Sequence, residues 1–288
     1  MPDQHEATLP VVVDADWLAR HLDEVALADV RWYLDGSSGY EAYLGGHLPG
    51  AVWIDVDHDL AAPPSPQGGR HPLPDPDHFA RALGRRGIGD DTPVVAYDDA
   101  GGSVAARLVW MLRVLGCPAA LLDGGMDAWQ GPLERESASR QPCERTVLPW
   151  PAERVVDAAT VLAATSDDSQ VLLDARARGR FTGESPSAVD ARPGHIPSAR
   201  SAQWQDNLTP DGRLLSAEQL RARFTALGVT TAVPPIAYCG SGVTACHDLL
   251  ALEHAGFAGA RLYPGSWSAW GADPELPAET GDPTTGAG

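Results

Sequence analysis

Cysteine is scarce in this sequence, and its few copies lie far apart. Only Cys117, Cys143, Cys239 and Cys246 occur among 288 residues. Four cysteines at these spacings provide neither a disulfide scaffold nor the paired C-x-x-C arrangement of a metal site. We therefore expect no metal centre. Cys246, which follows Cys239 by seven positions, is expected to pack on a helix.

Basic residues are also few. The chain has 21 Lys and Arg against 39 Asp and Glu, which gives a formal net charge of −18. This balance argues against nucleic acids and anionic membranes as partners. An anionic substrate would need a local positive potential, supplied by arginines and backbone N–H groups.

Long apolar runs and recognisable leader signals are lacking as well. No segment approaches the roughly 18 uninterrupted apolar residues of a membrane span, and residues 1–10 show no signal-peptide pattern. The GxxxxGK[ST] phosphate loop does not occur either. We expect a cytoplasmic protein without a membrane partner.

An internal repeat is present and predicts the domain organisation. Three segments of the first half recur in the same order in the second half, at offsets of 148, 141 and 141. The pairs are Gly46–Ala51 with Gly194–Ala199, Val94–Tyr97 with Pro235–Tyr238, and Gly124–Trp129 with Gly265–Trp270. The sequence therefore predicts two copies of one domain, at residues 1–135 and 154–288, joined by a polar linker at 136–153 that contains three prolines.

Short apolar runs alternate with helical patterns in each half, which predicts an α/β fold with a parallel sheet and helices on both faces. A capping box of Ser216 and Gln219 marks one helix start. The expected strands are Val25–Trp32, Ala51–Ile54, Pro93–Tyr97, Ala119–Leu122, Val171–Asp174, Pro235–Tyr238 and Ala260–Tyr263. The expected helices are Pro76–Arg86, Val104–Leu115, Ala158–Thr165, Ala217–Leu227 and Val243–His254.

The segment Cys239-Gly240-Ser241-Gly242-Val243-Thr244-Ala245 has the features of a reaction centre. It lies between a predicted strand and a predicted helix. Two glycines allow the backbone to curl so that several N–H groups face the sulfur. The positive end of the helix dipole adds to this effect, and such surroundings favour a nucleophilic thiolate.

This loop closely resembles that of the two-domain sulfurtransferases of the rhodanese family, in the form typical of 3-mercaptopyruvate sulfurtransferases. The resemblance implies two tandem rhodanese-like domains. Thiosulfate-specific relatives usually carry a basic pair where this chain has Gly240-Ser241. Phosphatases on a related fold need an arginine six positions after the cysteine, where this chain has Ala245, so that alternative loses its phosphate clamp.

The two copies differ at the reactive position. Asp98 aligns with Cys239, since each directly follows the tyrosine that ends a strand. A carboxylate cannot carry transferable sulfur, so the first domain is expected to be catalytically inactive. We expect the active site in the second domain, at the cleft between the domains.

The resemblance implies a double displacement that needs no metal or organic cofactor. Cys239 would take sulfur from 3-mercaptopyruvate, release pyruvate and pass the persulfide sulfur to an acceptor thiol such as thioredoxin, or to cyanide. The loop residues expected to bind the substrate are Gly240, Gly242, Val243 and Thr244.

Further site residues follow from the family's motifs. Trp53–Asp57 followed by His71–Pro74 resembles a segment in which Asp57 and His71 join Ser241 in a triad, although a Pro/Gly-rich insert at Pro63–Gly69 lengthens the spacing. In such a triad Ser241 relays a proton, His71 accepts it, and Asp57 fixes the imidazole tautomer.

Arginines are expected to bind the substrate carboxylate. Arg180 matches an arginine that family members use for this purpose, and its planar fork suits a carboxylate. A second arginine is expected near Val189, where this chain departs from the pattern. Arg192 is the nearest candidate, in a different register.

Several residues of these motifs are not expected in the site. His47 and His195 recur in both domains, including the inactive one, which favours a structural role. Trp32 and Tyr33 resemble a family segment near the cleft, but aromatic residues usually pack in cores.

Two other functions remain open on the sequence. A thiosulfate:cyanide sulfurtransferase would use the same cysteine. A persulfide carrier without enzymatic turnover would also need it. A comparison of 3-mercaptopyruvate and thiosulfate as sulfur donors distinguishes the two sulfurtransferases. Catalytic turnover distinguishes either enzyme from a persulfide carrier.

Overall fold

The computed structural model describes residues 9–282. Residues 1–8, which are part of the segment searched for a signal peptide, and residues 283–288 lie outside the described part. No helix within residues 9–282 combines the length and the apolar character that a bilayer span requires.

The first domain is built on a five-stranded sheet in which all pairings are parallel. Its order is β1-β5-β4-β2-β3. The strands are β1 (Val12–Val13), β2 (Ala26–Asp29), β3 (Val52–Trp53), β4 (Val94–Tyr97) and β5 (Ala119–Leu122). The helices are α1 (Ala15–His21), α2 (Gly39–Gly45), α3 (Pro76–Arg85) and α4 (Ala105–Val114), with a 3₁₀ turn at Gly125–Ala128.

Side chains on alternate strand positions enter two different cores, as a sheet covered on both faces requires. Val94 and Ala96 of β4 pack with the α3 and α4 side. Val95 and Tyr97 of the same strand pack with Leu18 of α1. The predicted coverage of both faces by helices is therefore confirmed in this domain.

The second domain repeats this design with a four-stranded parallel sheet in the order β7-β6-β8-β9. The strands are β6 (Leu172–Asp174), β7 (Arg200–Ser201), β8 (Ile236–Tyr238) and β9 (Arg261–Leu262). The helices are α5 (Ala158–Ala164), α6 (Arg178–Thr182), α7 (Ala217–Ala226), α8 (Ala245–His254) and α9 (Ser266–Trp270), with a 3₁₀ turn at Trp204–Asn207. The capping box of Ser216 and Gln219 is present at the start of α7.

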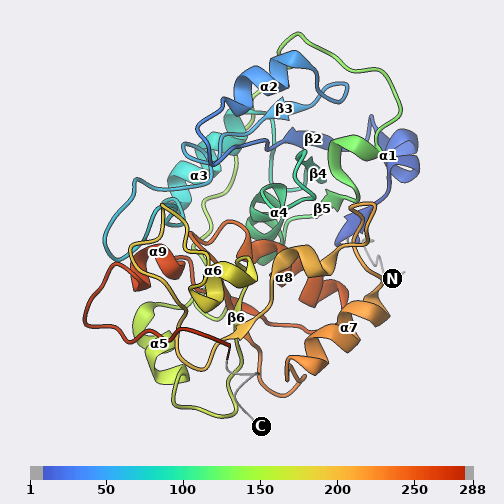
Figure 1. Ribbon diagram of the computed structural model, residues 1–288. Helices are drawn as coiled ribbons and strands as arrows, with labels where there is room; N and C mark the ends of the chain where they lie inside the picture. Colours follow the sequence, from blue (N-terminus) through green and yellow to red (C-terminus); the bar gives the residue numbers. More distant parts are fainter. Residues whose placement is uncertain (1–8, 283–288) are drawn as a thin grey trace, which may run out of the picture.

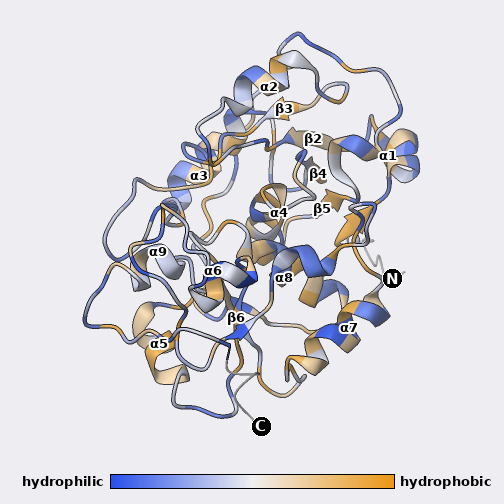
Figure 2. Cartoon of the chain, in the orientation of Figure 1, coloured by the Kyte–Doolittle hydropathy of each residue, from blue (hydrophilic) through white to orange (hydrophobic). Residues whose placement is uncertain are grey.

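Helices α4 and α8 join the two domains. They lie against each other in the middle of the molecule, between the two sheets (Figure 1). Their apolar residues belong to one continuous core that includes strands of both domains, and α4 is largely apolar, whereas α7 shows polar residues on the outside (Figure 2). Because this core is shared, the loops that precede α4 and α8 are held in fixed relation to each other.

The repeated histidines have structural roles, as expected. His47 Nδ1 lies 2.9 Å from the carbonyl of Tyr43, and its ring stacks on Tyr43. His195 Nδ1 lies 2.8 Å from the carbonyl of Phe181, and its ring stacks on Phe181. Each histidine therefore fixes the chain just before a strand of its sheet.

Every predicted element is observed, with its ends shifted by at most three residues, and several short elements were missed. β1, β7, α1, α2, α6 and α9 were not predicted. Each has at most seven residues, too few for a periodic pattern to stand out.

Candidate active site

Cys239 lies directly after β8 and is 2% exposed. Its sulfur accepts a hydrogen bond of 3.1 Å from the N–H of Gly242. Gly242 has a left-handed φ of 78°, and a Cβ there would come within 2.7 Å of the Pro264 carbonyl oxygen, so this turn requires glycine. The sequence predicted several amides around the sulfur; within residues 9–282 Gly242 provides the one backbone hydrogen bond to it.

The first residues of α9 form hydrogen bonds with the reactive loop. The N–H of Cys239 donates to Ser266 Oγ at 3.1 Å, and Ser266 Oγ donates to the carbonyl of Tyr263 at 2.9 Å. Ser268 N–H donates to the Gly240 carbonyl at 2.9 Å. Ser266 itself has a φ of 51°, which is uncommon for serine. These residues were not predicted as site residues, although they lie in the repeated Gly265–Trp270 segment.

Asp57, His71 and Ser241 come together across the domain interface despite the insert at Pro63–Gly69. His71 Nδ1 lies 2.8 Å from Ser241 Oγ, and Nε2 lies 3.0 Å from Asp57 Oδ1. With Nε2 donating to the carboxylate, Nδ1 is free to accept the Ser241 hydroxyl proton. Sequence reasoning thus placed these three residues together correctly.

Trp32 completes this chain of contacts, contrary to the expectation that it only packs in the core. Its Nε1 donates to Asp57 Oδ2 at 2.8 Å. Its ring meets the imidazole of His71 edge-on, with 5.3 Å between the centroids. Trp32 therefore orients both residues. Tyr33, by contrast, donates its hydroxyl to Asp99 at 2.6 Å.

The electrostatic surroundings keep His71 neutral. Burial, followed by the positive charge of Arg107, lowers the pKa of His71 to about 4, and Asp57 opposes this shift only in part. At neutral pH the imidazole therefore has a free lone pair, which suits a proton acceptor.

Arg107, on α4, is a further residue that sequence reasoning missed. It is fully buried and donates to the carbonyls of Leu60 and His71 at 2.9 Å, and to that of Gly242 at 2.9 Å. Its guanidinium thus joins the segment of His71 in the first domain to the cysteine loop in the second. Burial lowers the pKa of Arg107.

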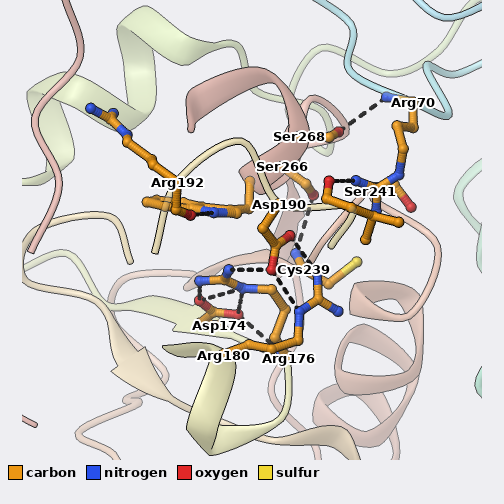
Figure 3. A network of polar contacts seen from close by, with 12 residues as sticks. Arg70, Asp174, Arg176, Arg180, Asp190, Arg192, Cys239, Ser241, Ser266 and Ser268 are labelled. Carbon is orange, nitrogen blue, oxygen red and sulfur yellow. Dashed lines mark hydrogen bonds and ion pairs between the residues drawn. The ribbon is translucent and has the colours of Figure 1, made fainter. Parts of the chain in front are cut away.

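Arg180 turns one side of its guanidinium toward a carboxylate and the other toward the loop (Figure 3). Nε and Nη2 donate to the two oxygens of Asp190 at 2.8 and 2.6 Å. A Cβ on Gly240 would lie 3.0 Å from Nη2 and 3.6 Å from Nη1. The terminal fork of Arg180 therefore faces the residue next to Cys239, where it can bind an anion.

Neither Arg192 nor the chain at Val189 places a second arginine of the second domain beside Cys239. Arg192 points away from Cys239 (Figure 3), and its Nη2 donates to the Leu276 carbonyl at 2.6 Å, so it does not serve the site. Val189 contributes its carbonyl oxygen, which accepts a 2.9 Å hydrogen bond from Arg70 Nη1. Arg70 was not predicted, because it lies at the end of the insert, outside the family motif.

The corresponding loop of the first domain is occupied by its own side chain. The carboxylate of Asp98 accepts four backbone hydrogen bonds of 2.8–2.9 Å, from Ala100, Gly102, Val104 and Ala105. Two of these donors begin α4, which has no other side-chain cap. The Asp98 carboxylate therefore occupies the ring of backbone N–H groups in this domain. The catalytic inactivity of the first domain stays a prediction.

A cavity of about 1030 Å³ lies beside this centre, between residues 66–68 of the insert and residues 155–160 and 263–276 of the second domain. None of the predicted site residues lines it. Within residues 9–282 no cluster of three His, Cys, Asp or Glu side chains suited to a metal ion is found.

Two tandem α/β domains, with a buried thiol on a strand-loop-helix turn of the second, define the class to which this chain belongs. The family model described as "Rhodanese-like domain" matches residues 14–132 and again residues 157–273. The chain therefore belongs to the rhodanese family, and its fold of two rhodanese-like domains is confirmed.

Relatives cover nearly the whole chain. The chain is 45% identical to a Pseudomonas aeruginosa protein named "Probable 3-mercaptopyruvate sulfurtransferase", over 94% of this chain and 98% of that protein. It is 38% identical to a Mycobacterium tuberculosis protein whose name refers to thiosulfate sulfurtransferase, over 90% and 92%. The solved structure of 3-mercaptopyruvate sulfurtransferase from Leishmania major matches with a TM-score of 0.78 at 30% identity, over 93% of this chain and 75% of that one.

Proposed function

We propose that this chain is a 3-mercaptopyruvate sulfurtransferase, which passes sulfur through a Cys239 persulfide to an acceptor thiol, such as that of thioredoxin, or to cyanide. The observation that carries the proposal is the hydrogen-bonded chain from Asp57 through His71 to Ser241, which ends two residues from the buried thiol. The names of the relatives support the same activity.

The first half-reaction needs a nucleophile and a proton relay. The Cys239 thiolate attacks the sulfur of 3-mercaptopyruvate, an S–S bond forms, and the C–S electron pair leaves on carbon as the enolate of pyruvate. Ser241 passes the donor's thiol proton to Nδ1 of His71, and the imidazolium returns it to the enolate carbon. The products are pyruvate and the Cys239 persulfide anion.

Each remaining residue has one role in this scheme. Asp57 holds the imidazole tautomer and stabilises the transient imidazolium. Arg180 binds the donor's carboxylate through its terminal fork. Gly240 and Gly242 let the backbone approach the substrate, and Val243 and Thr244 form the wall of the loop. In the second half-reaction an acceptor thiolate or cyanide attacks the outer sulfur and restores Cys239. A cytoplasmic location stays a prediction.

The test is release of pyruvate from 3-mercaptopyruvate in the presence of dithiothreitol. We expect turnover by the unaltered protein, no turnover by Cys239→Ser, and normal turnover by Cys143→Ser, since Cys143 is exposed. Pyruvate release that survives Cys239→Ser would refute the proposal.

Thiosulfate is the second donor to test, because one relative is named for it. A higher kcat/KM for thiosulfate than for 3-mercaptopyruvate would assign the chain to that activity instead. Loading of a single sulfur without turnover on either donor would indicate a persulfide carrier.

A further inference from the structure

Arg70 belongs to the first domain, but its contacts lie in the second. Its backbone N–H donates to Ser268 Oγ at 3.0 Å, and its Nη1 donates to the carbonyl of Val189 at 2.9 Å (Figure 3). Main chain and side chain of Arg70 are thus both fixed by the second domain. The guanidinium is held in place before any substrate binds.

Two arginines converge on the same small space. A Cβ on Gly240 would lie 3.1 Å from Arg70 Nη2 and 3.0 Å from Arg180 Nη2. The nitrogens come from different domains and approach the residue that follows Cys239. An anionic group beside Gly240 can therefore contact both guanidinium groups at once.

Of the two arginines at this point, only Arg180 has a carboxylate partner among residues 9–282. Asp190 forms its ion pair with Arg180, at 2.6 Å, and lies 3.8 Å from Arg176, whose own partner is Asp174. Among residues 9–282, no ion pair between Arg70 and a carboxylate is found, and its buried Nε has no hydrogen-bond partner. Burial, followed by the charge of Arg180, lowers the pKa of Arg70, and Asp190 and Cys239 oppose this shift only in part. A second anion at this site would relieve that repulsion.

We propose that Arg70 is a specificity-determining residue that binds the carboxylate of the sulfur donor together with Arg180. This inference rests on the proposed function. Arg70 supplies across the domain interface the cation that the family pattern expects near Val189, and Val189 holds it through its carbonyl oxygen. Selectivity for donors with a carboxylate next to the keto group then depends on a residue of the catalytically inactive domain.

The first test compares two donors that differ only in the carboxylate. Mercaptoacetone has a methyl group where 3-mercaptopyruvate has its carboxylate, and the same C–S bond breaks in both. For Arg70→Gln we expect kcat/KM for 3-mercaptopyruvate to fall by about 10- to 100-fold, mainly through KM, and kcat/KM for mercaptoacetone to change less than about two-fold. Arg70→Lys should recover part of the loss, because it restores the charge without the fork.

Arg81→Gln is the matched control. It removes the same charge from an exposed i,i+4 pair with Asp77 on α3, and should leave both donors unaffected. An equal loss for both donors in Arg70→Gln, or no loss for either, would overturn the role of Arg70 while leaving the proposed function in place. Failure of the unaltered protein to release pyruvate would instead refute the proposed function.

A second test needs no turnover. Iodoacetate and iodoacetamide alkylate a thiolate by the same displacement of iodide, but only iodoacetate carries a carboxylate. In Arg70→Gln the ratio of the iodoacetate rate to the iodoacetamide rate at Cys239 should fall several-fold, measured on the peptide by mass spectrometry. The exposed Cys143 is the reference within the same molecule, and its ratio should stay constant. An unchanged ratio at Cys239 in a variant with a normal thermal transition would also overturn the proposal.

Discussion

Asp98 and Cys239 leave their sheets at equivalent points of the repeat, and both side chains accept backbone hydrogen bonds from the loop that follows. Asp98 accepts four and Cys239 accepts one. One copy therefore uses the turn to cap α4 and stabilise the domain, whereas the other leaves its sulfur with lone pairs free to react. We therefore expect the first copy of the loop to stabilise its domain and the second copy to carry the reactive thiol.

Replacement of Asp98 by alanine should test the stabilising half of this arrangement. Four N–H groups, three of them buried, would lose their acceptor. We therefore expect the free energy of unfolding to fall by about 3 kcal/mol or more. Denaturant unfolding measures the loss. The control is Asp35→Ala, which removes an exposed turn carboxylate bound to the Ser37 N–H. A loss no larger than that of Asp35→Ala would show that the nest does not need its carboxylate.

Arg107 should be essential for the domain interface. Arg107→Met would leave the buried carbonyls of Leu60, His71 and Gly242 without this donor, and we expect a loss of about 3 kcal/mol in unfolding free energy. Arg107→Lys should not restore stability, because one ammonium group cannot reach both domains in the same geometry. Arg81→Met, at an exposed position of α3, is the control. Equal stability of the two methionine variants would remove Arg107 from this role.

Ser241 and His71 should act as one unit. Ser241→Ala and His71→Gln should each lower kcat for pyruvate release by about 100-fold, since each breaks the same proton relay. The double variant should be little worse than either single variant, because the second change finds the relay already broken. Multiplicative losses in the double variant would mean that the two residues act independently despite their 2.8 Å contact.

Much of the fold could be predicted because the repeat and the longer apolar runs are local patterns. β4, β5, α3, α4, α7 and α8 all lie close to their expected bounds. β7 was missed, although the offset of 148 maps β3 (Val52–Trp53) onto Arg200–Ser201. Unlike β3, β7 consists of two polar residues and shows no apolar run of its own, so only the comparison of the copies could have revealed it.

The site was predictable where a motif covers it and not elsewhere. Cys239, Ser241, His71 and Asp57 come from recognisable segments and lie close together. Arg70, Arg107 and Trp32 act through contacts with residues far away in the sequence, and those contacts depend on how the two domains pack. No local pattern encodes that packing for Arg70 and Arg107, so these two residues could be found only in the structure. The family segment that contains Trp32 did point to the cleft, but an aromatic residue there was interpreted as part of the core.

The buried His71 should make stability depend on pH. Its pKa is about 4 in the folded chain and about 6.5 when the chain is unfolded, so below pH 6.5 the unfolded state takes up a proton that the folded state does not. The free energy of unfolding therefore falls as the pH drops from 6.5 toward 4.

Between pH 7.5 and 5.0 this one group should account for a loss of about 2 kcal/mol. The side chain introduced in His71→Gln takes up no proton. The unfolding free energy of this variant should therefore fall by about 2 kcal/mol less than that of the unaltered protein over the same pH interval, as measured by denaturant unfolding. Parallel pH profiles for the two proteins would show that the imidazole is as easily protonated in the folded state as in water, and would exclude His71 as the neutral proton acceptor.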